Sequence, residues 1–92
     1  MIKSFKDKRT EQIFKGIAVK KMDMTLQAKA QAKLFILEAA QALTDLYQPP
    51  SNRFEALGGD LKNHYSIRVN VQWRIVFAWD AGAVEVTLID YH

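Results

Sequence analysis

Residues 65–79, YSIRVNVQWRIVFAW, decide the fold. Apolar and polar side chains alternate along residues 65–69, and residues 73–79 are rich in the aromatic and β-branched side chains that β-strands favour. Residues 70–72 between them form a connection short enough for a hairpin. The stretch therefore predicts two antiparallel strands that lie side by side in a sheet.

The pattern continues toward the C-terminus. Residues 80–83, DAGA, predict a second hairpin turn, and residues 84–89 predict a further strand. On the other side, residues 53–57 alternate weakly and are compatible with one more strand, whereas residues 58–63 predict a turn or loop. We therefore expect a meander of three or four antiparallel strands.

The first half of the chain shows helical periodicity instead. Residues 2–5 are compatible with a short first strand, and Thr10 or Asp7 is expected to begin a helix that ends around Val19. The apolar side of this helix is formed by Ile13, Phe14 and Ile17.

A second, longer helix is expected to begin at Asp23 or Thr25 and to stop before Pro49-Pro50, because the residue before a proline avoids helical backbone angles. Steps of three and four residues define a single apolar stripe along it. The stripe consists of Leu26, Ala30, Leu34, Leu37, Ala40, Leu43 and Tyr47.

These elements predict an α+β fold with the order β-α-α-β-β-β. Two N-terminal helices packed on one face of a small, curled antiparallel sheet bury the apolar sides of both layers. The length of 92 residues suits a single domain, residues 1–92, with little room for an enclosed cofactor pocket. The other face of the sheet is left open, and we expect it to carry the function.

Composition removes several classes of site. The chain has no cysteine, which excludes disulfides, thiolate metal sites and cysteine nucleophiles. The spacing of the other residues offers no zinc site, no Ser-His-Asp triad and no phosphate-binding glycine loop, so we expect no cofactor. The N-terminus lacks the apolar run of a signal peptide, and no stretch is apolar enough to cross a membrane. We expect a cytoplasmic protein.

The charge is distributed unevenly. Residues 1–33 hold nine lysines and arginines and three acidic residues, whereas residues 34–92 hold four and seven, within a net charge of +3. A basic half suits a polyanion such as nucleic acid, and it equally suits a solvated, lysine-rich helical surface. Charge alone leaves both interpretations open.

Strand alternation assigns side chains to two faces. The expected core face carries Tyr65, Ile67, Val69, Trp73, Ile75, Phe77, Trp79, Val84, Val86 and Leu88. The expected open face carries Ser66, Arg68, Asn70, Arg74, Val76, Ala78, Glu85, Thr87, Ile89 and Tyr91. The planar fork of arginine matches phosphate oxygens, so the open face is a plausible phosphate-binding surface. Parity places Asp90 and His92 on the core side unless the strand end projects past the core or follows a bulge.

The sequence resembles the HigB branch of the RelE/ParE toxin superfamily over essentially its whole length. The residues that carry the resemblance are Met1-Ile2-Lys3-Ser4-Phe5, Pro49-Pro50, Asn52-Arg53, Glu55-Ala56-Leu57, Gly59-Asp60, Tyr65-Ser66-Ile67-Arg68-Val69-Asn70, Gln72-Trp73-Arg74-Ile75, Phe77 and Asp90-Tyr91-His92.

The resemblance implies the toxin of a type II toxin–antitoxin pair, similar in fold to microbial ribonucleases. HigB-type toxins enter the ribosomal A site and cut messenger RNA there. A HigA-type antitoxin with a helix-turn-helix neutralises them, and operator DNA is bound only through that antitoxin.

RNA supplies its own nucleophile, the 2′-hydroxyl, so the protein needs groups for the phosphate and for protons. We assign Arg74 to the phosphate and its developing charge, and His92 to proton transfer because histidine titrates near neutrality. Tyr91 is a candidate for hydrogen bonding or stacking, and Asp90 for orientation or proton transfer. Candidate RNA contacts are Arg53, Lys62 and Arg68.

One loop departs from the family pattern. The family commonly has a lysine and then Gly-Asp-Arg after its Glu-x-Leu element, and this chain has Gly58 and Leu61 at the two basic positions. Lys62 is a candidate replacement for one of them. This departure leaves open a weakened toxin that acts mainly in its antitoxin complex. Because a fold does not fix a function, a non-enzymatic, ParE-like inhibitor of a protein such as DNA gyrase stays open as well.

Overall fold

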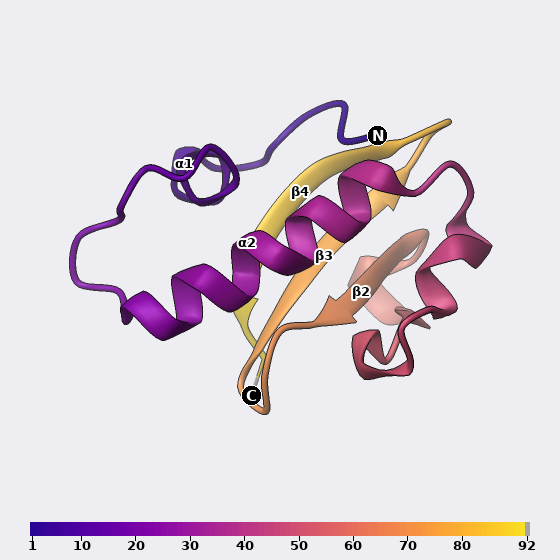
Figure 1. Cartoon of the computed structure of the whole chain (residues 1–92). Helices are drawn as coiled ribbons and strands as arrows, with labels where there is room; N and C mark the ends of the chain where they lie inside the picture. Colours follow the sequence, from indigo (N-terminus) through magenta and orange to yellow (C-terminus); the bar gives the residue numbers. More distant parts are fainter. Residues whose placement is uncertain (92) are drawn as a thin grey trace.

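The computed structural model describes residues 1–91 and shows an α+β fold (Figure 1). Its sheet has four antiparallel strands in the order β1-β2-β3-β4. Three short 3₁₀ helices connect the second α-helix to the sheet and the first two strands to each other. The elements are α1 (Lys8–Phe14), α2 (Met24–Ala39), η1 (Leu43–Tyr47), η2 (Pro50–Asn52), β1 (Glu55–Ala56), η3 (Gly59–Leu61), β2 (His64–Arg68), β3 (Trp73–Trp79) and β4 (Ala83–Asp90).

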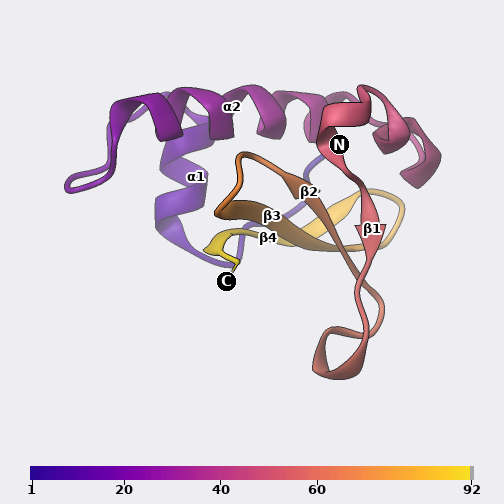
Figure 2. The ribbon, with the colours of Figure 1, turned by 90° about the horizontal axis from the view of Figure 1, so that it is seen from below.

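Both α-helices lie on one side of the sheet, as the sequence predicts (Figure 2). The apolar side of α2 contributes Leu34 and Leu37 to the core, and the sheet contributes Ile67, Ile75 and Phe77, all of them fully buried. Trp73 and Trp79 pack against this core and are half-buried, which agrees with their predicted structural role. No helix within residues 1–91 is long and apolar enough to cross a membrane.

The face away from the helices is less open than alternation predicts. Ser66 and Val76, both assigned to it, are 0% and 4% exposed. They pair with each other in the middle of the sheet, and the side chain of Arg74 donates a hydrogen bond to Ser66 Oγ. The middle of this face is therefore closed at the Ser66–Val76 pair.

The N-terminal segment forms two isolated bridges beside β4 instead of the predicted strand. Ile2 pairs with Ala83 and Phe5 with Val86, both in parallel. The N–H of Lys3 donates to the carbonyl of Ala83 at 2.7 Å, and the N–H of Lys6 donates to that of Val86 at 2.9 Å. The segment thus covers the edge of β4, which would otherwise present unpaired backbone groups.

A bulge in β4 overturns part of the predicted core face. Between the pairs Val76–Thr87 and Ala78–Val84, β3 has one residue and β4 has two. Glu85 takes a positive φ of 56° there, and its N–H donates to Ser4 Oγ at 2.9 Å. Because one extra residue reverses the alternation, Val84 is only half-buried and Ala83 fills the core in its place.

Helix α1 ends at Phe14, earlier than the predicted end around Val19. Gly16 has a φ of 78°, a left-handed conformation that glycine adopts without steric cost. Its N–H donates to the carbonyl of Ile13, and the N–H of Ile17 donates to that of Gln12. These two bonds form the Schellman motif that commonly ends helices at glycine.

Helix α2 also ends earlier than its apolar stripe predicts. Ala40 adopts extended backbone angles, and its carbonyl accepts a hydrogen bond from the Met1 amino group at 2.8 Å. The Asp45 carboxylate accepts from the next two backbone N–H groups, those of Gln41 and Ala42, and begins the 3₁₀ helix η1. The changed periodicity buries Leu46 and leaves Tyr47, the last residue of the predicted stripe, 60% exposed.

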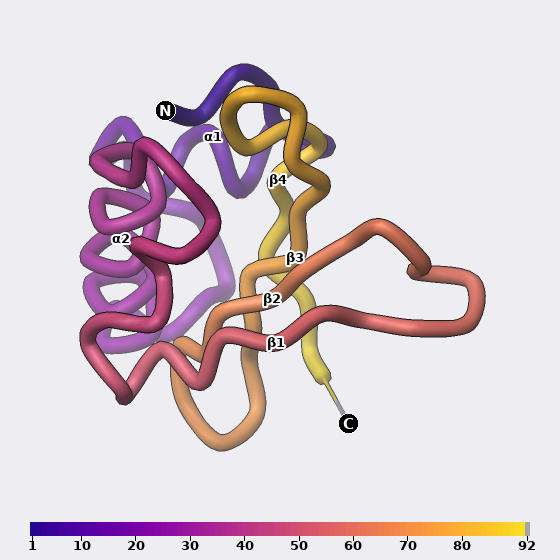
Figure 3. Tube along the Cα trace, turned by 90° about the vertical axis from the view of Figure 1, so that its right-hand side faces the viewer, coloured from indigo at the N-terminus to yellow at the C-terminus, as the bar shows by residue number. Residues whose placement is uncertain are grey.

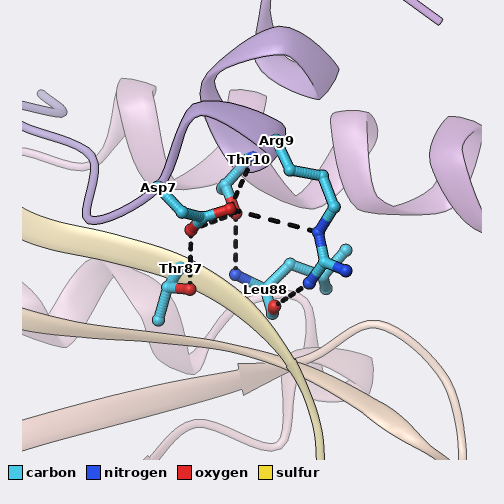
Figure 4. Close-up of polar contacts among 5 residues, drawn as sticks. All are labelled: Asp7, Arg9, Thr10, Thr87 and Leu88. Atoms are coloured by element: carbon cyan, nitrogen blue, oxygen red, sulfur yellow. Dashed lines mark hydrogen bonds and ion pairs between the residues drawn. The ribbon is translucent and has the colours of Figure 1, made fainter. Parts of the chain in front are cut away.

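Asp7 joins α1 to β4 (Figure 4). As the N-cap of α1, its carboxylate accepts from the N–H and Oγ1 of Thr10, and it also accepts from Thr87 Oγ1 at 2.7 Å. Thr10 Oγ1 in turn accepts from the N–H of Leu88 at 3.0 Å, and Arg9 donates to the Leu88 carbonyl at 2.8 Å. Burial raises the pKa of Asp7, but the hydrogen bonds from Thr87 and Thr10 together outweigh it and lower the pKa below its usual value.

Replacing Asp7 with alanine is expected to destabilise the protein in a pH-dependent way. Loss of an N-cap costs about 1 kcal/mol, which corresponds to a melting temperature lower by roughly 4–8 °C in a domain of this size. Because the pKa of Asp7 is lower in the folded state, its contribution is present above the unfolded value near 3.8 and disappears as the pH falls through the folded value.

Melting curves of the wild type and Asp7→Ala at pH 7 and below pH 3 check this expectation. The difference between the two proteins should shrink in acid, and Asp60→Ala, at an exposed position in η3, should melt like the wild type throughout. Equal melting temperatures for Asp7→Ala and the wild type at pH 7 would contradict the assigned role.

Candidate active site

An open groove of about 460 Å³ lies on the face of the sheet away from the helices. We call it the arginine groove. Its walls come from β1, β2, the hairpin between β2 and β3, β3 and the end of the chain. The lining residues are Arg53, Phe54, Glu55, Arg68, Asn70, Val71, Arg74 and Tyr91.

Arg74 is an enclosed charge in this groove, with a side chain that is 11% exposed. Its Nε donates to Ser66 Oγ at 2.8 Å, and its Nη2 donates to the carbonyl of Arg53 at 2.7 Å. Nη2 also lies 3.6 Å from the carboxylate of Glu55. None of the contacts given for residues 1–91 uses Nη1, so this nitrogen is available to a ligand.

The surroundings of Arg74 change its electrostatics. Burial lowers the pKa of its guanidinium, Glu55 and Tyr91 act in the opposite direction, and Arg68 and Arg53 lower it further. An arginine keeps its proton at neutral pH under such conditions. The groove therefore holds a partly desolvated cation, which binds an anion more strongly than an exposed cation does.

Arg53 contributes both its backbone carbonyl and its side chain to the groove. It follows η2 in a left-handed conformation with φ 43° and ψ 50°, which is uncommon for a residue with a side chain. This conformation places its carbonyl on Arg74 while its side chain lines the groove. Backbone strain of this kind is often found at functional sites.

The end of the chain reaches the groove through Tyr91. Its N–H donates to the carbonyl of Gln72 at 2.7 Å, and its ring lies 5.6 Å from the guanidinium carbon of Arg74. Asp90 pairs with Trp73 at the exposed end of β4, and its carboxylate accepts from Gln72 Nε2 at 2.9 Å. Asp90 thus holds the chain end beside the hairpin, past the edge of the core.

The other predicted residues divide between the groove and its surroundings. Arg68 lines the groove, and its Nε donates to the carbonyl of Asn70 at 3.0 Å. Lys62 is exposed and is not among the lining residues of the groove. It belongs to the loop that projects from the sheet in Figure 3, together with Gly58 and Leu61. The prediction for His92 lies outside the described residues.

Sequence reasoning missed the two groove residues that precede and begin β1. Glu55 pairs with Ser66 across the sheet, which places its carboxylate beside Arg74. Phe54 stacks on Tyr65 with ring centres 5.7 Å apart and lines the groove. The weak alternation of residues 53–57 was the available signal, because it predicts that side chains of this strand share the face of Arg74.

Comparison with known proteins places this chain in a family. A family model described as the RelE-like toxin of the type II toxin–antitoxin system HigB matches residues 3–92. The chain belongs to the HigB-like toxin family. It is 43% identical to Toxin HigB-1 of Vibrio cholerae serotype O1, over 93 aligned residues that cover 100% of this chain and 98% of that protein. A Haemophilus influenzae protein that carries no functional name is 35% identical over 60 residues, 65% of this chain and 59% of that protein.

A solved structure supports the fold. The chain is similar to a chain of the YoeB–YefM complex from Staphylococcus aureus, with a TM-score of 0.64 and 16% identity, over 100% of this chain and 98% of that chain. The HigB-like toxin therefore has the RelE-like fold that its sequence predicts, and as a toxin of a type II system it has an antitoxin as its partner.

Removing the hydroxyl of Ser66 tests how Arg74 is held. In Ser66→Ala the guanidinium loses its Nε partner in a buried position, which is expected to cost about 1–3 kcal/mol of unfolding free energy. Growth arrest on induction should need a higher dose, because Arg74 is less well oriented. Chemical unfolding and a dose series check both effects, with the exposed-site variant Thr44→Ala as a control. Toxicity and stability equal to those of the control would contradict the assigned role of Ser66.

Proposed function

We propose that this HigB-like toxin is a ribosome-dependent endoribonuclease that cuts messenger RNA in the ribosomal A site. The observation that carries the proposal is Arg74, an enclosed cation with two of its nitrogens fixed by Ser66 and Arg53 and the third available in an open groove. A groove without walls on all sides suits a polymer strand better than a small molecule.

The proposed reaction uses the RNA's own 2′-hydroxyl. Its oxygen attacks the adjacent phosphorus, the bond to the 5′-oxygen of the next nucleotide breaks, and the products carry a 2′,3′-cyclic phosphate and a 5′-hydroxyl. Negative charge grows on the non-bridging oxygens in the transition state. Arg74 is placed to stabilise that charge, because its position is set before the substrate arrives.

Two proton transfers complete the reaction. Glu55 lies 3.6 Å from Arg74 Nη2, so a phosphate bound to Arg74 brings its 2′-hydroxyl near a carboxylate that can accept the proton. We assign Glu55 this role. His92 remains our candidate for returning a proton to the departing 5′-oxygen, on the chemistry of histidine. Asp90 acts as a positioning residue for that chain end through Gln72.

We propose that the remaining groove residues contact the bases and the backbone of the RNA strand. Tyr91 is 39% exposed beside Arg74, and Phe54 is half-buried, so each offers an aromatic surface on which a base can stack. Arg53 and Arg68 add positive charge to the groove beside Arg74. The groove itself is small, and we propose that the ribosome presents the messenger in the geometry that the groove requires.

We also propose that the partner is a HigA-type antitoxin with a helix-turn-helix, and that operator DNA is bound only through it. In this proposal the antitoxin neutralises the toxin by denying RNA access to the arginine groove. A downstream reading frame for a helix-turn-helix protein would support this pairing.

Arg74→Ala and Glu55→Gln test the reaction. Loss of one fixed donor to the transition state is expected to lower cleavage about 10²–10³-fold, and loss of a general base about 10²–10⁴-fold. Primer extension on a translated messenger in a reconstituted system measures both, with a naked transcript as the substrate that should stay intact. Lys20→Ala, at an exposed site outside the groove, is the matched control.

Unchanged cleavage in Arg74→Ala would contradict the assigned site. DNA damage signalling without transcript cleavage by the wild type would instead favour the ParE-like alternative, in which the toxin inhibits a protein such as DNA gyrase.

The loop at Gly58 and Leu61 tests the weakened-toxin alternative. No atom comes within 4 Å of a Cβ placed at Gly58, so Gly58→Lys meets no steric obstacle, and Leu61→Arg is combined with it to restore the second basic position. Because neither position lines the arginine groove, we expect the two added charges to change toxicity little. A sharp rise in toxicity on induction would show that the natural loop weakens the toxin.

A further inference from the structure

A second groove, of about 480 Å³, adjoins the arginine groove at Arg53 and Arg68, which line both. It lies between α2, the end of η2 and the end of β2. We call it the lysine groove. Its lining residues are Lys29, Ala32, Lys33, Ser51, Arg53, Arg68 and Val69. Four of these seven residues are cations, and none of them is acidic.

Lys33 is held in this groove by neutral groups. Its Nζ donates to Asn52 Oδ1 at 2.7 Å and to Ser51 Oγ at 3.0 Å. Asn52 is fully buried, and its Nδ2 donates to the carbonyls of Leu46 and Gln48, so its Oδ1 is fixed toward the lysine. An ammonium has three N–H donors, and two are used here. The third is left for an acceptor in the groove.

The charges of the lysine groove have no described carboxylate partner. The ion pairs within residues 1–91 join Lys3 to Asp80, Arg9 to Asp7, Lys15 to Glu11 and Arg74 to Glu55. Burial lowers the pKa of Lys33, because enclosing a charge away from water costs free energy.

The sequence of α2 adds to this cost. Lys29 and Lys33 are four residues apart on the helix, where like charges repel and weaken a helix. A bound anion would offset both the repulsion and the desolvation of Lys33. The two lysines therefore destabilise the free protein slightly, and an anion bound between them would relieve this cost.

We propose that the lysine groove binds a second phosphate of the same RNA strand whose scissile phosphate lies at Arg74. This inference rests on the proposed function. Arg53 and Arg68 lie between the two positions because they line both grooves. A strand with a phosphate at every nucleotide contacts both grooves at once, so the lysine groove fixes the register of the strand and Arg74 acts on the phosphate in that register.

The test compares two doubly substituted toxins with the same loss of charge. Lys29→Gln/Lys33→Gln changes the lysine groove, and Gln at position 33 still offers a donor to Asn52 Oδ1. Lys8→Gln/Lys20→Gln removes two exposed charges that line neither groove. Binding of a fluorescent, uncleavable 2′-O-methyl oligoribonucleotide is measured by anisotropy as a function of salt concentration.

The groove variant should lose the phosphate contacts and the control should keep them. For single-stranded RNA, the slope of log affinity against log salt concentration decreases by about 0.7 for each phosphate contact that is lost. At 50 mM salt this corresponds to an affinity that is roughly five- to tenfold weaker. Shortening the oligonucleotide to a single phosphate should abolish the difference between the groove variant and the control. Lys33→Arg keeps the charge and should bind like the wild type.

Equal slopes for the two double variants would overturn the proposal, as would wild-type toxin that binds no oligonucleotide at low salt. Unchanged RNA binding with weaker antitoxin binding would also overturn it, because the groove would then receive an acidic segment of the protein partner. If Lys29→Gln/Lys33→Gln fails to fold, Lys29→Gln alone, at an exposed position, gives the same comparison with Lys8→Gln.

Cleavage separates this inference from the proposed function. If the toxin cuts translated messenger and the groove variant cuts as fast as the control at the same positions, the endoribonuclease stands and the second phosphate site fails. If the wild type cuts no messenger while the groove variant still loses RNA affinity, the phosphate site stands and the proposed reaction fails.

Discussion

The enclosure of one guanidinium connects the fold of this toxin to its chemistry. Arg74 lies on a strand in the middle of the sheet, where a cation would be unfavourable without partners. Ser66 on the neighbouring strand and the carbonyl of Arg53 after η2 supply those partners at 2.8 and 2.7 Å. Glu55 adds only a weak ion pair, because its side chain is 52% exposed to water. The hydrogen bonds therefore hold the charge in place.

This arrangement requires a particular register of the sheet. Arg68 pairs with Arg74 across the hairpin, and Glu55 pairs with Ser66 across the edge, so residues from β1, β2 and β3 meet on one face. The helices cover the opposite face and leave this one to a ligand (Figure 2). The contacts of Asp7 and Thr10 with β4 fasten α1 to the sheet and help to fix that division (Figure 4).

The local parts of this fold were predictable from sequence. The hairpin of residues 65–79 and its two faces follow from alternation over neighbouring residues, and they placed Arg68, Arg74 and Tyr91 together. Gly16 is a sequence signal for the end of α1, but the apolar residue Ile17 after it favours a longer helix. The early end of α2 depends on two groups outside this helix. The Met1 amino group is far from Ala40 in sequence, and Asp45 belongs to η1.

The features that escaped prediction depend on tertiary structure. An arginine rarely adopts the left-handed backbone of Arg53, so no propensity indicates it. The bulge at Glu85 is stabilised by Ser4 at the other end of the chain. Glu55 enters the site through a strand of only two residues, and the weak alternation of residues 53–57 indicates its face but not its partner Arg74. The family predicted from the resemblance to HigB-type toxins is confirmed. The hydrogen-bond partners of Arg74 are visible only in the structure.

The central claim is that the enclosed Arg74 activates a phosphate for attack by the RNA's own 2′-hydroxyl. The chemistry of the cut ends tests it most directly. Mass spectrometry of the fragments from a translated messenger should find 2′,3′-cyclic phosphate, or the 3′-phosphate formed from it, on one side of the cut and a 5′-hydroxyl on the other. Fragments with a 3′-hydroxyl and a 5′-phosphate would contradict the account, because water would then be the nucleophile.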